Sequence, residues 1–229
     1  MTHNFRQFYC EAPLCEGQAV TLPPALQHRL HNVLRLKAGD TLHLFDGHNG
    51  IFAATLADAK ARSATVGACV RPFAPPPPLT LLMGLPKRDA WETILRQATE
   101  LGATEIIPLL ARRSVPTKLN MERARALLVE AAEQCERHTV PTLAEPQPLP
   151  AGIQQWHIAN PASQLAWANE NGGAPLHGAS AVLVGPEGGF DDNEQQWLSA
   201  QPYIHTVTLG PTVLRADTAA ACALTLARL

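Results

Sequence analysis

The sequence lacks the cysteine patterns and long apolar runs that define several protein classes. Its five cysteines are odd in number and include no Cys-x-x-Cys pair, so no disulfide framework is expected. No apolar run approaches the roughly 18 residues of a membrane-spanning helix, and residues 1–10 lack the apolar stretch of a secretory signal. We therefore expect a soluble, cytoplasmic protein with reduced thiols and no membrane partner.

The chain also lacks a strong charge of either sign. It has 18 Lys and Arg against 20 Asp and Glu, a formal net charge of −2. Residues 1–74 carry seven of the basic residues against five acids, together with five of the nine histidines, so the remainder is acidic. A mildly basic, His-rich front suits a polyanion such as a nucleic acid. An ordinary solvated surface explains this small excess equally well.

What the sequence does contain is enough apolar mass for a folded core. Hydrophobic residues make up 46% and charged residues 17% of the 229 residues, which excludes a disordered chain and fits two domains. Four consecutive prolines at 75–78 cannot continue a helix and favour a short, stiff spacer. We therefore expect domains at 1–74 and 75–229.

The front segment has the pattern of a small β-rich domain. Strands are predicted at 41–45 and 51–56 around the turn-forming residues 46–50, which is the pattern of a hairpin. A further strand is predicted at 66–70 and a helix at 24–36. The apolar residues expected on one side of that helix are Leu26, Leu30, Val33 and Leu34.

The rear segment alternates continuous apolar runs with helical periods. The expected order is strand 79–85, helix 89–101, strand 105–110, helix 121–138, strand 156–159, strand 181–184, helix 192–200, strand 204–209 and a closing helix. Apolar strands that alternate with helices predict a parallel α/β sheet covered on both faces.

A glycine loop, Gly185-Pro186-Glu187-Gly188-Gly189-Phe190, follows strand 181–184 directly. Asp191 and Glu194 come next at the spacing of a helix capping box. Glycines allow a ligand to approach the backbone closely. The loop lacks the Gly-Lys-Ser/Thr of a phosphate loop, and Glu187, Asp191 and Asp192 would repel a polyphosphate. A ligand that is cationic or neutral at its reacting centre fits better, and a tight structural turn is the simpler alternative.

A second loop, residues 209–218, follows strand 204–209 and precedes an alanine-rich helix. Ligand crevices in open parallel sheets lie beyond the carboxyl ends of the strands, so the two loops are expected to flank one crevice. Arg215 sits among apolar neighbours in this loop. It needs a partner, either Asp217 or a ligand carboxylate.

Two other polar patterns have simpler interpretations. His28 and His31 are three residues apart on a predicted helix, but no carboxylate or cysteine cluster accompanies them, so no metal site is expected. On the predicted helix 121–138 polar residues recur at helical spacing, which is typical of a solvated face. These residues are Glu130, Glu133, Gln134 and Arg137.

Several short sequence segments, taken together, resemble the RsmE family of ribosomal RNA methyltransferases, in the SPOUT superfamily. The two C-terminal signatures are matched by Gly185 to Phe190 with Glu194, and by Leu209-Gly210, Val213-Leu214-Arg215 and Asp217-Thr218-Ala219-Ala220. Further matches follow the family's order at Phe5 to Phe8, His28 to Asp40, Leu44 to Gly47, Lys87 to Glu92, Ala98 to Gly102, Pro108 and Glu130 to Arg137.

The sequence departs from the family pattern at a few places. Asp217 stands where the family often has Glu, and Glu136 where it usually has Gly. Residues 141–180 align poorly. Within them, Asn160-Pro161 corresponds loosely to the family's third cofactor-binding loop.

The resemblance implies an α/β fold in which a SPOUT-type methyltransferase domain with a deep trefoil knot follows a small PUA-like β-barrel that binds RNA. It also implies a homodimer and S-adenosyl-L-methionine as the cofactor, held by the knot loops. The implied cofactor-binding residues are Leu183, Gly185, Glu187, Gly188, Gly189, Leu209, Gly210, Val213 and Leu214.

The implied activity is methylation of the N3 of a specific uridine in small-subunit (16S) ribosomal RNA, naked or in the assembling subunit. The reaction requires loss of the N3 proton, stabilisation of the imide anion and an unpaired or flipped base. Arg215 is the catalytic candidate, and the RNA-binding candidates are Arg6, His28, Arg35 and Arg137. The alternatives are a noncatalytic RNA-binding ribosome-assembly protein and a SPOUT methyltransferase that acts on tRNA.

Overall fold

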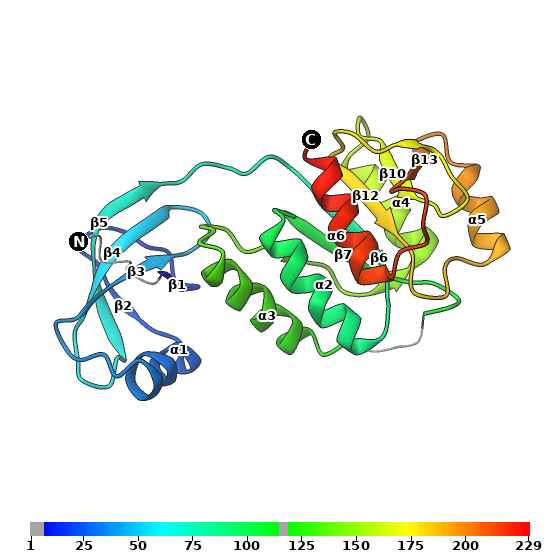
Figure 1. Cartoon of the computed structure of the whole chain (residues 1–229). Coiled ribbons are helices and arrows are strands. Elements are labelled where there is room, and N and C mark those ends of the chain that lie inside the picture. The colour runs from blue at the N-terminus through cyan, green and yellow to red at the C-terminus, as the bar shows by residue number, and fades with distance from the viewer. Residues whose placement is uncertain (1–6, 115–118) are drawn as a thin grey trace. The chain divides into compact units, whose positions relative to one another are not determined.

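The structure, a computed structural model, describes residues 7–114 and 119–229. Across these residues, every helix is too short or too polar to traverse a bilayer. The chain divides into two compact units (Figure 1). The first runs to Pro75 and adds Ala132–Val140, and the second consists of Pro76–Ala131 and Pro141–Leu229. The first unit therefore includes a segment that is distant in sequence.

The first unit is built on a five-stranded sheet in the order β1-β3-β4-β5-β2. The strands are β1 (Gln7–Tyr9), β2 (Ala19–Thr21), β3 (Thr41–Phe45), β4 (Gly50–Leu56) and β5 (Ser63–Pro72). β3 and β4 pair antiparallel, which confirms the predicted hairpin. The alternating apolar residues Leu42 and Leu44 are buried together with Val20 and Val66 in the core of this unit.

The predicted helix 24–36 is shorter than expected and changes its winding. An α-helix, α1 (Pro24–His28), passes into a π-helical turn, η1 (Arg29–Val33). The N–H of Leu34 donates to the carbonyl of Arg29, five residues back. This wider turn alters the angular spacing of side chains, so Leu30 is buried while Val33 is 63% exposed.

Residues 132–140 contribute a buried ion pair to the first unit. Ala132 packs against Phe45 and Ile51. The carboxylate of Glu133 pairs with Arg29 and accepts the N–H of Tyr9, and its side chain is only 6% exposed. The prediction of a solvated face is therefore wrong at Glu133, because the first unit supplies a cation and a backbone donor that satisfy the buried carboxylate.

The second unit contains an eight-stranded sheet with the path β11-β13-β10-β12-β6-β7-β8, and β9 also pairs with β7. Its strands are β6 (Thr80–Gly84), β7 (Glu105–Leu110), β8 (Thr142–Leu143), β9 (Gln147–Pro148), β10 (Leu165–Ala168), β11 (Ala174–Pro175), β12 (Ala181–Val184) and β13 (Ile204–Thr208). Every strand pair in this sheet is parallel, as predicted.

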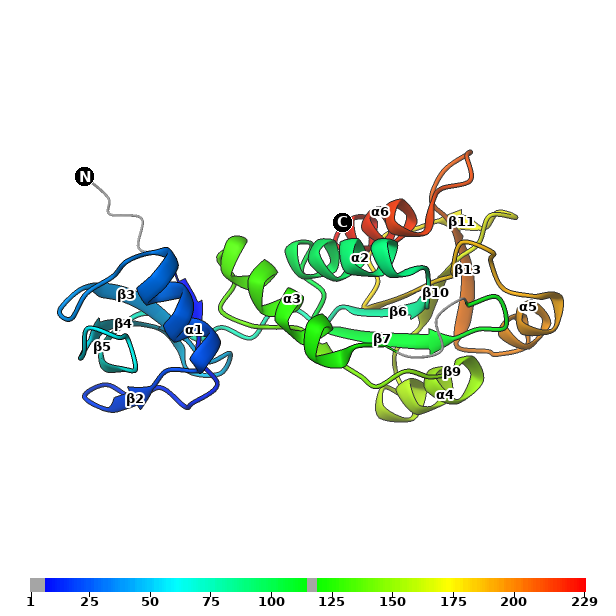
Figure 2. The same cartoon turned by 90° about the horizontal axis from the view of Figure 1, so that it is seen from below.

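Helices cover both faces of this sheet. They are α2 (Arg88–Glu100), α3 (Met121–Gln134), α4 (Leu149–Ala159), α5 (Asp192–Ser199) and α6 (Ala216–Ala227). Figures 1 and 2 agree in placing α2 and α6 side by side on one face, with α4 on the other. α2 buries Trp91, Ile94, Leu95 and Ala98, which recur at helical spacing.

The strand predicted at 156–159 is wrong, because these residues form the last turns of α4. The helix begins after Pro148, carries a proline in its first turn, and buries Leu149, Gly152, Ile153 and Trp156 on one side. A short apolar run cannot by itself distinguish a strand from the buried side of a helix. The strand at this part of the sheet is β10, which pairs with both β12 and β13.

Candidate functional site

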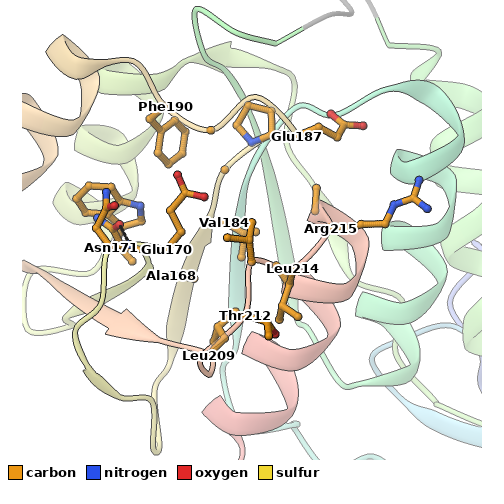
Figure 3. Close-up of a pocket in the computed structure, with 18 of the residues that line it drawn as sticks. Ala168, Glu170, Asn171, Val184, Glu187, Phe190, Leu209, Thr212, Leu214 and Arg215 are labelled. Atoms are coloured by element: carbon orange, nitrogen blue, oxygen red, sulfur yellow. Dashed lines mark hydrogen bonds between the residues drawn. The ribbon is translucent and has the colours of Figure 1, made fainter.

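A cavity of about 410 Å³ opens where the neighbouring strands β10, β12 and β13 end (Figure 3). Three segments form most of its lining: the Glu170 loop (residues 168–171), the glycine loop (residues 185–190) and the Arg215 loop (residues 209–215). The described residues that line it outside these loops are Arg113, Trp167, Val184, Gln195, Ala216 and Ala219. Parallel strands end at the same edge of a sheet, so loops far apart in sequence converge there. The volume lies in the range of small-molecule sites.

The glycine loop is anchored by the helix that follows it. The side chain of Asp191 accepts the N–H of Glu194, and Glu194 Oε2 accepts the N–H of Asp191, which confirms the predicted capping box. The other oxygen of the buried Glu194 carboxylate accepts the N–H of Arg112 at 2.8 Å. The start of α5 is therefore fixed to the segment after β7, and this arrangement sets the path of the loop.

Two glycines of the cavity have backbone conformations that other residues rarely adopt. Gly189 has φ +65° and Gly210 has φ +135°. Gly188 differs, because its φ is ordinary and an added Cβ would lie 3.2 Å from the Arg113 Cβ. Arg113 also donates to the Gly188 carbonyl at 2.8 Å. Gly188 therefore contacts Arg113 rather than the cavity.

Seven of the nine predicted cofactor-binding residues lie together on the cavity wall. They are Gly185, Glu187, Gly189, Leu209, Gly210, Val213 and Leu214. The other two do not line the cavity. Leu183 is fully buried in the core beneath it, and Gly188 faces Arg113. Asn160 and Pro161, which follow α4, are also absent from the lining.

The two glutamates that line the cavity are oriented differently. Glu187 accepts the backbone N–H of Lys87, at 3.0 Å to one oxygen and 3.3 Å to the other. Figure 3 shows its carboxylate turned away from Phe190. The carboxylate of Glu170 instead points between Phe190 and Val184. The acid inside the cavity therefore comes from the Glu170 loop.

Arg215 lines the cavity at its edge, where it precedes the first residue of α6. Its side chain is exposed, and in Figure 3 it extends away from Glu170 and Phe190. Within residues 7–114 and 119–229, Arg215 forms no ion pair with Asp217. The Asp217 carboxylate accepts the N–H of Thr218 instead. Arg215 is thus available to an incoming ligand.

Sequence reasoning missed the Glu170 loop and Trp167. Trp167 is 3% exposed and packs near Phe190, with ring centroids 6.2 Å apart. A signal was present, because the apolar run Leu-Ala-Trp-Ala of β10 is followed by Asn169-Glu170-Asn171-Gly172-Gly173, the pattern of a strand exit. The strand was instead predicted at the apolar run 156–159, so the exit from β10 was not recognised.

The RNA-binding candidates within the described residues all belong to the first unit. His28 and Arg35 are exposed, and Arg35 has a positive φ of 56°. Arg137 is half-buried and donates to the Thr139 hydroxyl. Arg6 lies outside the described residues. In the part of the chain that is described, no three His, Cys, Asp or Glu gather closely enough to hold a metal ion.

Comparison with protein families divides the chain in a similar way. Residues 74–228 match an RNA methyltransferase domain family, and residues 30–69 match an RNA methyltransferase PUA domain family. A protein of Synechocystis named ribosomal RNA small subunit methyltransferase E is 35% identical over 90% of this chain and 71% of its own length. One of the same name from Rickettsia conorii is 31% identical over 99% of this chain and 96% of its own.

Solved structures give the same assignment. A ribosomal RNA small subunit methyltransferase E from Neisseria gonorrhoeae, bound to S-adenosylmethionine, superposes with a TM-score of 0.83 at 27% identity. The match covers 96% of this chain and 95% of that one. A methyltransferase from Legionella pneumophila in complex with the same cofactor also has a TM-score of 0.83, at 26% identity over 98% and 97% of the two chains. The chain described here therefore belongs to the ribosomal RNA small subunit methyltransferase E family.

Proposed function

We propose that this protein is an S-adenosyl-L-methionine-dependent methyltransferase that modifies the N3 of a specific uridine in small-subunit (16S) ribosomal RNA. One observation carries the proposal. The cavity at the ends of β10, β12 and β13 is lined by the glycine and Arg215 loops, which resemble the cofactor-binding signatures of a family with S-adenosylmethionine-bound members.

The residues of the cavity fit this cofactor. Val184, Phe190 and Leu214 provide apolar surface for an adenine ring, and the glycines leave backbone groups open to hydrogen bonding. Among the described residues no lysine lines the cavity; of its two arginines, Arg113 donates to the Gly188 carbonyl and Arg215 extends away from Glu170 and Phe190, and the carboxylate of Glu170 points inward. A nucleoside with a positively charged sulfur therefore suits it better than a nucleoside polyphosphate.

When bound, S-adenosylmethionine supplies an electrophilic methyl group. The glycine loop and the Arg215 loop hold and orient the cofactor, which turns an encounter in solution into a reaction between positioned groups. The uracil N3–H must lose its proton before the nitrogen can attack. Arg215, exposed at the edge of the cavity, stabilises the negative charge on the imide.

The fold proposal has two parts. Residues 1–74 form a PUA-like RNA-binding domain, and residues 75–229 form a SPOUT-type methyltransferase domain whose C-terminal strands and helices thread a deep trefoil knot. The PUA and methyltransferase family matches support the division. The convergence of three strand-exit loops on one cavity is consistent with the knot.

The partners follow from this function. The substrate is ribosomal RNA or the assembling small subunit in the cytoplasm, bound through Arg6, His28, Arg35 and Arg137. The active form is a homodimer made by the methyltransferase domain. Val213, an apolar cavity residue that is 77% exposed, supports this because a second subunit can cover it. A monomer by light scattering at micromolar concentration would contradict the dimer.

Transfer of a tritiated methyl group tests the function. Purified protein and labelled S-adenosylmethionine are incubated with small-subunit rRNA, with small ribosomal subunits and with tRNA, all isolated from cells that lack the protein. We expect label in the ribosomal substrates and none in tRNA. Label in tRNA alone would identify a tRNA enzyme, and cofactor binding without label anywhere would favour a noncatalytic assembly protein.

A further inference from the structure

The carboxylate of Glu170 is the charged group that reaches into the cavity. Glu170 belongs to the loop that leaves β10, and its side chain points between the ring of Phe190 and Val184 (Figure 3). Within the described residues, the Glu170 carboxylate forms no hydrogen bond and no ion pair. The cavity thus presents an uncompensated negative charge to its ligand.

The two basic residues of the lining do not neutralise this charge. Arg113 donates to the Gly188 carbonyl at 2.8 Å. Arg215 extends away from Glu170, on the far side of Leu214. Glu187, the other lining acid, is held by the N–H of Lys87. Among the described residues that line the cavity, Glu170 alone therefore combines a net charge with a direct approach to the apolar interior.

We propose that Glu170 determines specificity by attracting the sulfonium of S-adenosylmethionine, and so favours the methyl donor over its neutral product, S-adenosylhomocysteine. This inference rests on the proposed function. The two molecules differ by one methyl group and one positive charge. Their adenine, ribose and amino-acid groups are the same, so only a group that senses the sulfur can distinguish them.

The chemistry of the cavity favours a charge interaction at this position. A sulfonium has no N–H or O–H to donate, so a protein recognises it by charge and by contact with apolar or aromatic surface. Phe190 and Trp167 supply the aromatic surface and Glu170 supplies the charge. Because Glu170 is exposed, water weakens the attraction to that of a surface ion pair, about two- to fivefold in affinity.

Isothermal titration with S-adenosylmethionine and, separately, with S-adenosylhomocysteine tests the proposal. The proteins are the full-length wild type, Glu170→Gln and the matched control Glu122→Gln. Glu122 is exposed on α3 and does not line this cavity. We expect Glu170→Gln to weaken S-adenosylmethionine binding about two- to fivefold and to leave S-adenosylhomocysteine binding unchanged. The loss should shrink as salt is added, and the control should match the wild type.

Two results would overturn the proposal. An equal loss of affinity for both ligands would assign Glu170 to a group that they share, such as the ribose hydroxyls. Unchanged affinity for both would remove Glu170 from recognition altogether. A wild-type protein that binds neither ligand contradicts the proposed function as well, and so differs from a failure at Glu170 alone. Thermal melts of the three proteins show that each is folded.

Discussion

The backbone N–H of Lys87 donates to the carboxylate of Glu187, 3.0 Å from the nearer oxygen. Lys87 immediately precedes α2, and Glu187 lies in the glycine loop, so this bond joins the segments that follow β6 and β12. The role of Glu187 is then to hold the loop through an acceptor oxygen, whereas Glu170 acts through its charge.

Replacement of Glu187 should separate hydrogen bonding from charge. Glu187→Gln keeps an oxygen that can accept the Lys87 N–H, so we expect its affinity for S-adenosylmethionine to stay within about twofold of the wild type. Glu187→Ala removes the acceptor and frees the loop, and should weaken binding about fivefold, equivalent to roughly 1 kcal/mol. Titration calorimetry measures both variants. Equal losses in the two would contradict a hydrogen-bonding role.

The adjacent glycines Gly188 and Gly189 provide a matched pair for the same substitution. Gly189→Ala forces a side chain into a left-handed backbone with φ +65°, at a cost of about 1–2 kcal/mol. Gly188→Ala has an ordinary φ and needs only a shift of a few tenths of an ångström by Arg113. We therefore expect Gly189→Ala to lose more cofactor affinity. The order is checked by calorimetry, and the reverse order would show that Gly188 faces the ligand.

Arg215→Ala should lower turnover without a matching loss of stability. The Arg215 side chain is exposed and forms no ion pair within residues 7–114 and 119–229, so unfolding free energy should change by less than about 0.5 kcal/mol. Turnover with saturating cofactor should fall by about tenfold or more, because the imide anion loses a cation. A methylation assay beside a thermal melt decides this. Activity that falls only with the folded fraction would end the catalytic assignment.

Asp46 should make the first unit sensitive to acid. Burial raises the pKa of this carboxyl, but donation from the Asn49 amide and from the N–H groups of His48, Asn49 and Leu14 outweighs it, so the pKa lies below its usual value. The folded pKa is lower than the unfolded one. The contribution to stability is therefore present above the unfolded pKa, about 4, and is lost as pH falls through the folded pKa.

The variant Asp46→Asn tests whether Asp46 stabilises the first unit at neutral pH and loses this effect in acid. At pH 7 it should lose about 1–3 kcal/mol of unfolding free energy, because a charged acceptor of several hydrogen bonds is replaced by a neutral amide. The difference in unfolding free energy between the variant and the wild type should become smaller as pH drops below about 4. Urea unfolding at pH 7, 5, 4 and 3 measures it. A difference that widened in acid would contradict the lowered pKa.

Arg35 should contribute to RNA affinity through its charge. Because it has φ 56°, the best neutral replacement is Asn, which tolerates the left-handed region. Arg35→Asn should weaken RNA binding and reduce the slope of log affinity against log salt by about one unit, as expected for one lost phosphate contact. Cofactor affinity should not change. An unaltered salt slope would place Arg35 away from the RNA.

The local features of the fold follow from short-range chemistry that the sequence displays. Asp191 and Glu194 stand at capping-box spacing, and both reciprocal bonds form. The hairpin of β3 and β4 follows from alternating apolar residues around a turn. Features that depend on distant segments were not predictable. Glu133 is buried because Arg29, 104 residues away, pairs with it.

The candidate site likewise combines features that the sequence predicts with features that depend on distant segments. The glycine and Arg215 loops could be recognised because each follows an apolar strand and carries glycines. Glu170 could not be assigned, since only the pairing of β10 with both β12 and β13 brings its loop to the same cavity. The direction of the Glu187 carboxylate was equally hidden, because it depends on the N–H of Lys87, 100 residues away.

The central claim is that this protein methylates uracil N3 in small-subunit ribosomal RNA, and nucleoside mass spectrometry with positional mapping tests it most directly. Small-subunit rRNA and intact small ribosomal subunits, both from cells that lack the protein, are each treated with the purified wild type and S-adenosylmethionine, and the rRNA is then digested and mapped. The account predicts N3-methyluridine at one position, present after treatment and absent before. A methyl group on another atom, or rRNA that stays unchanged in both substrates, would contradict it.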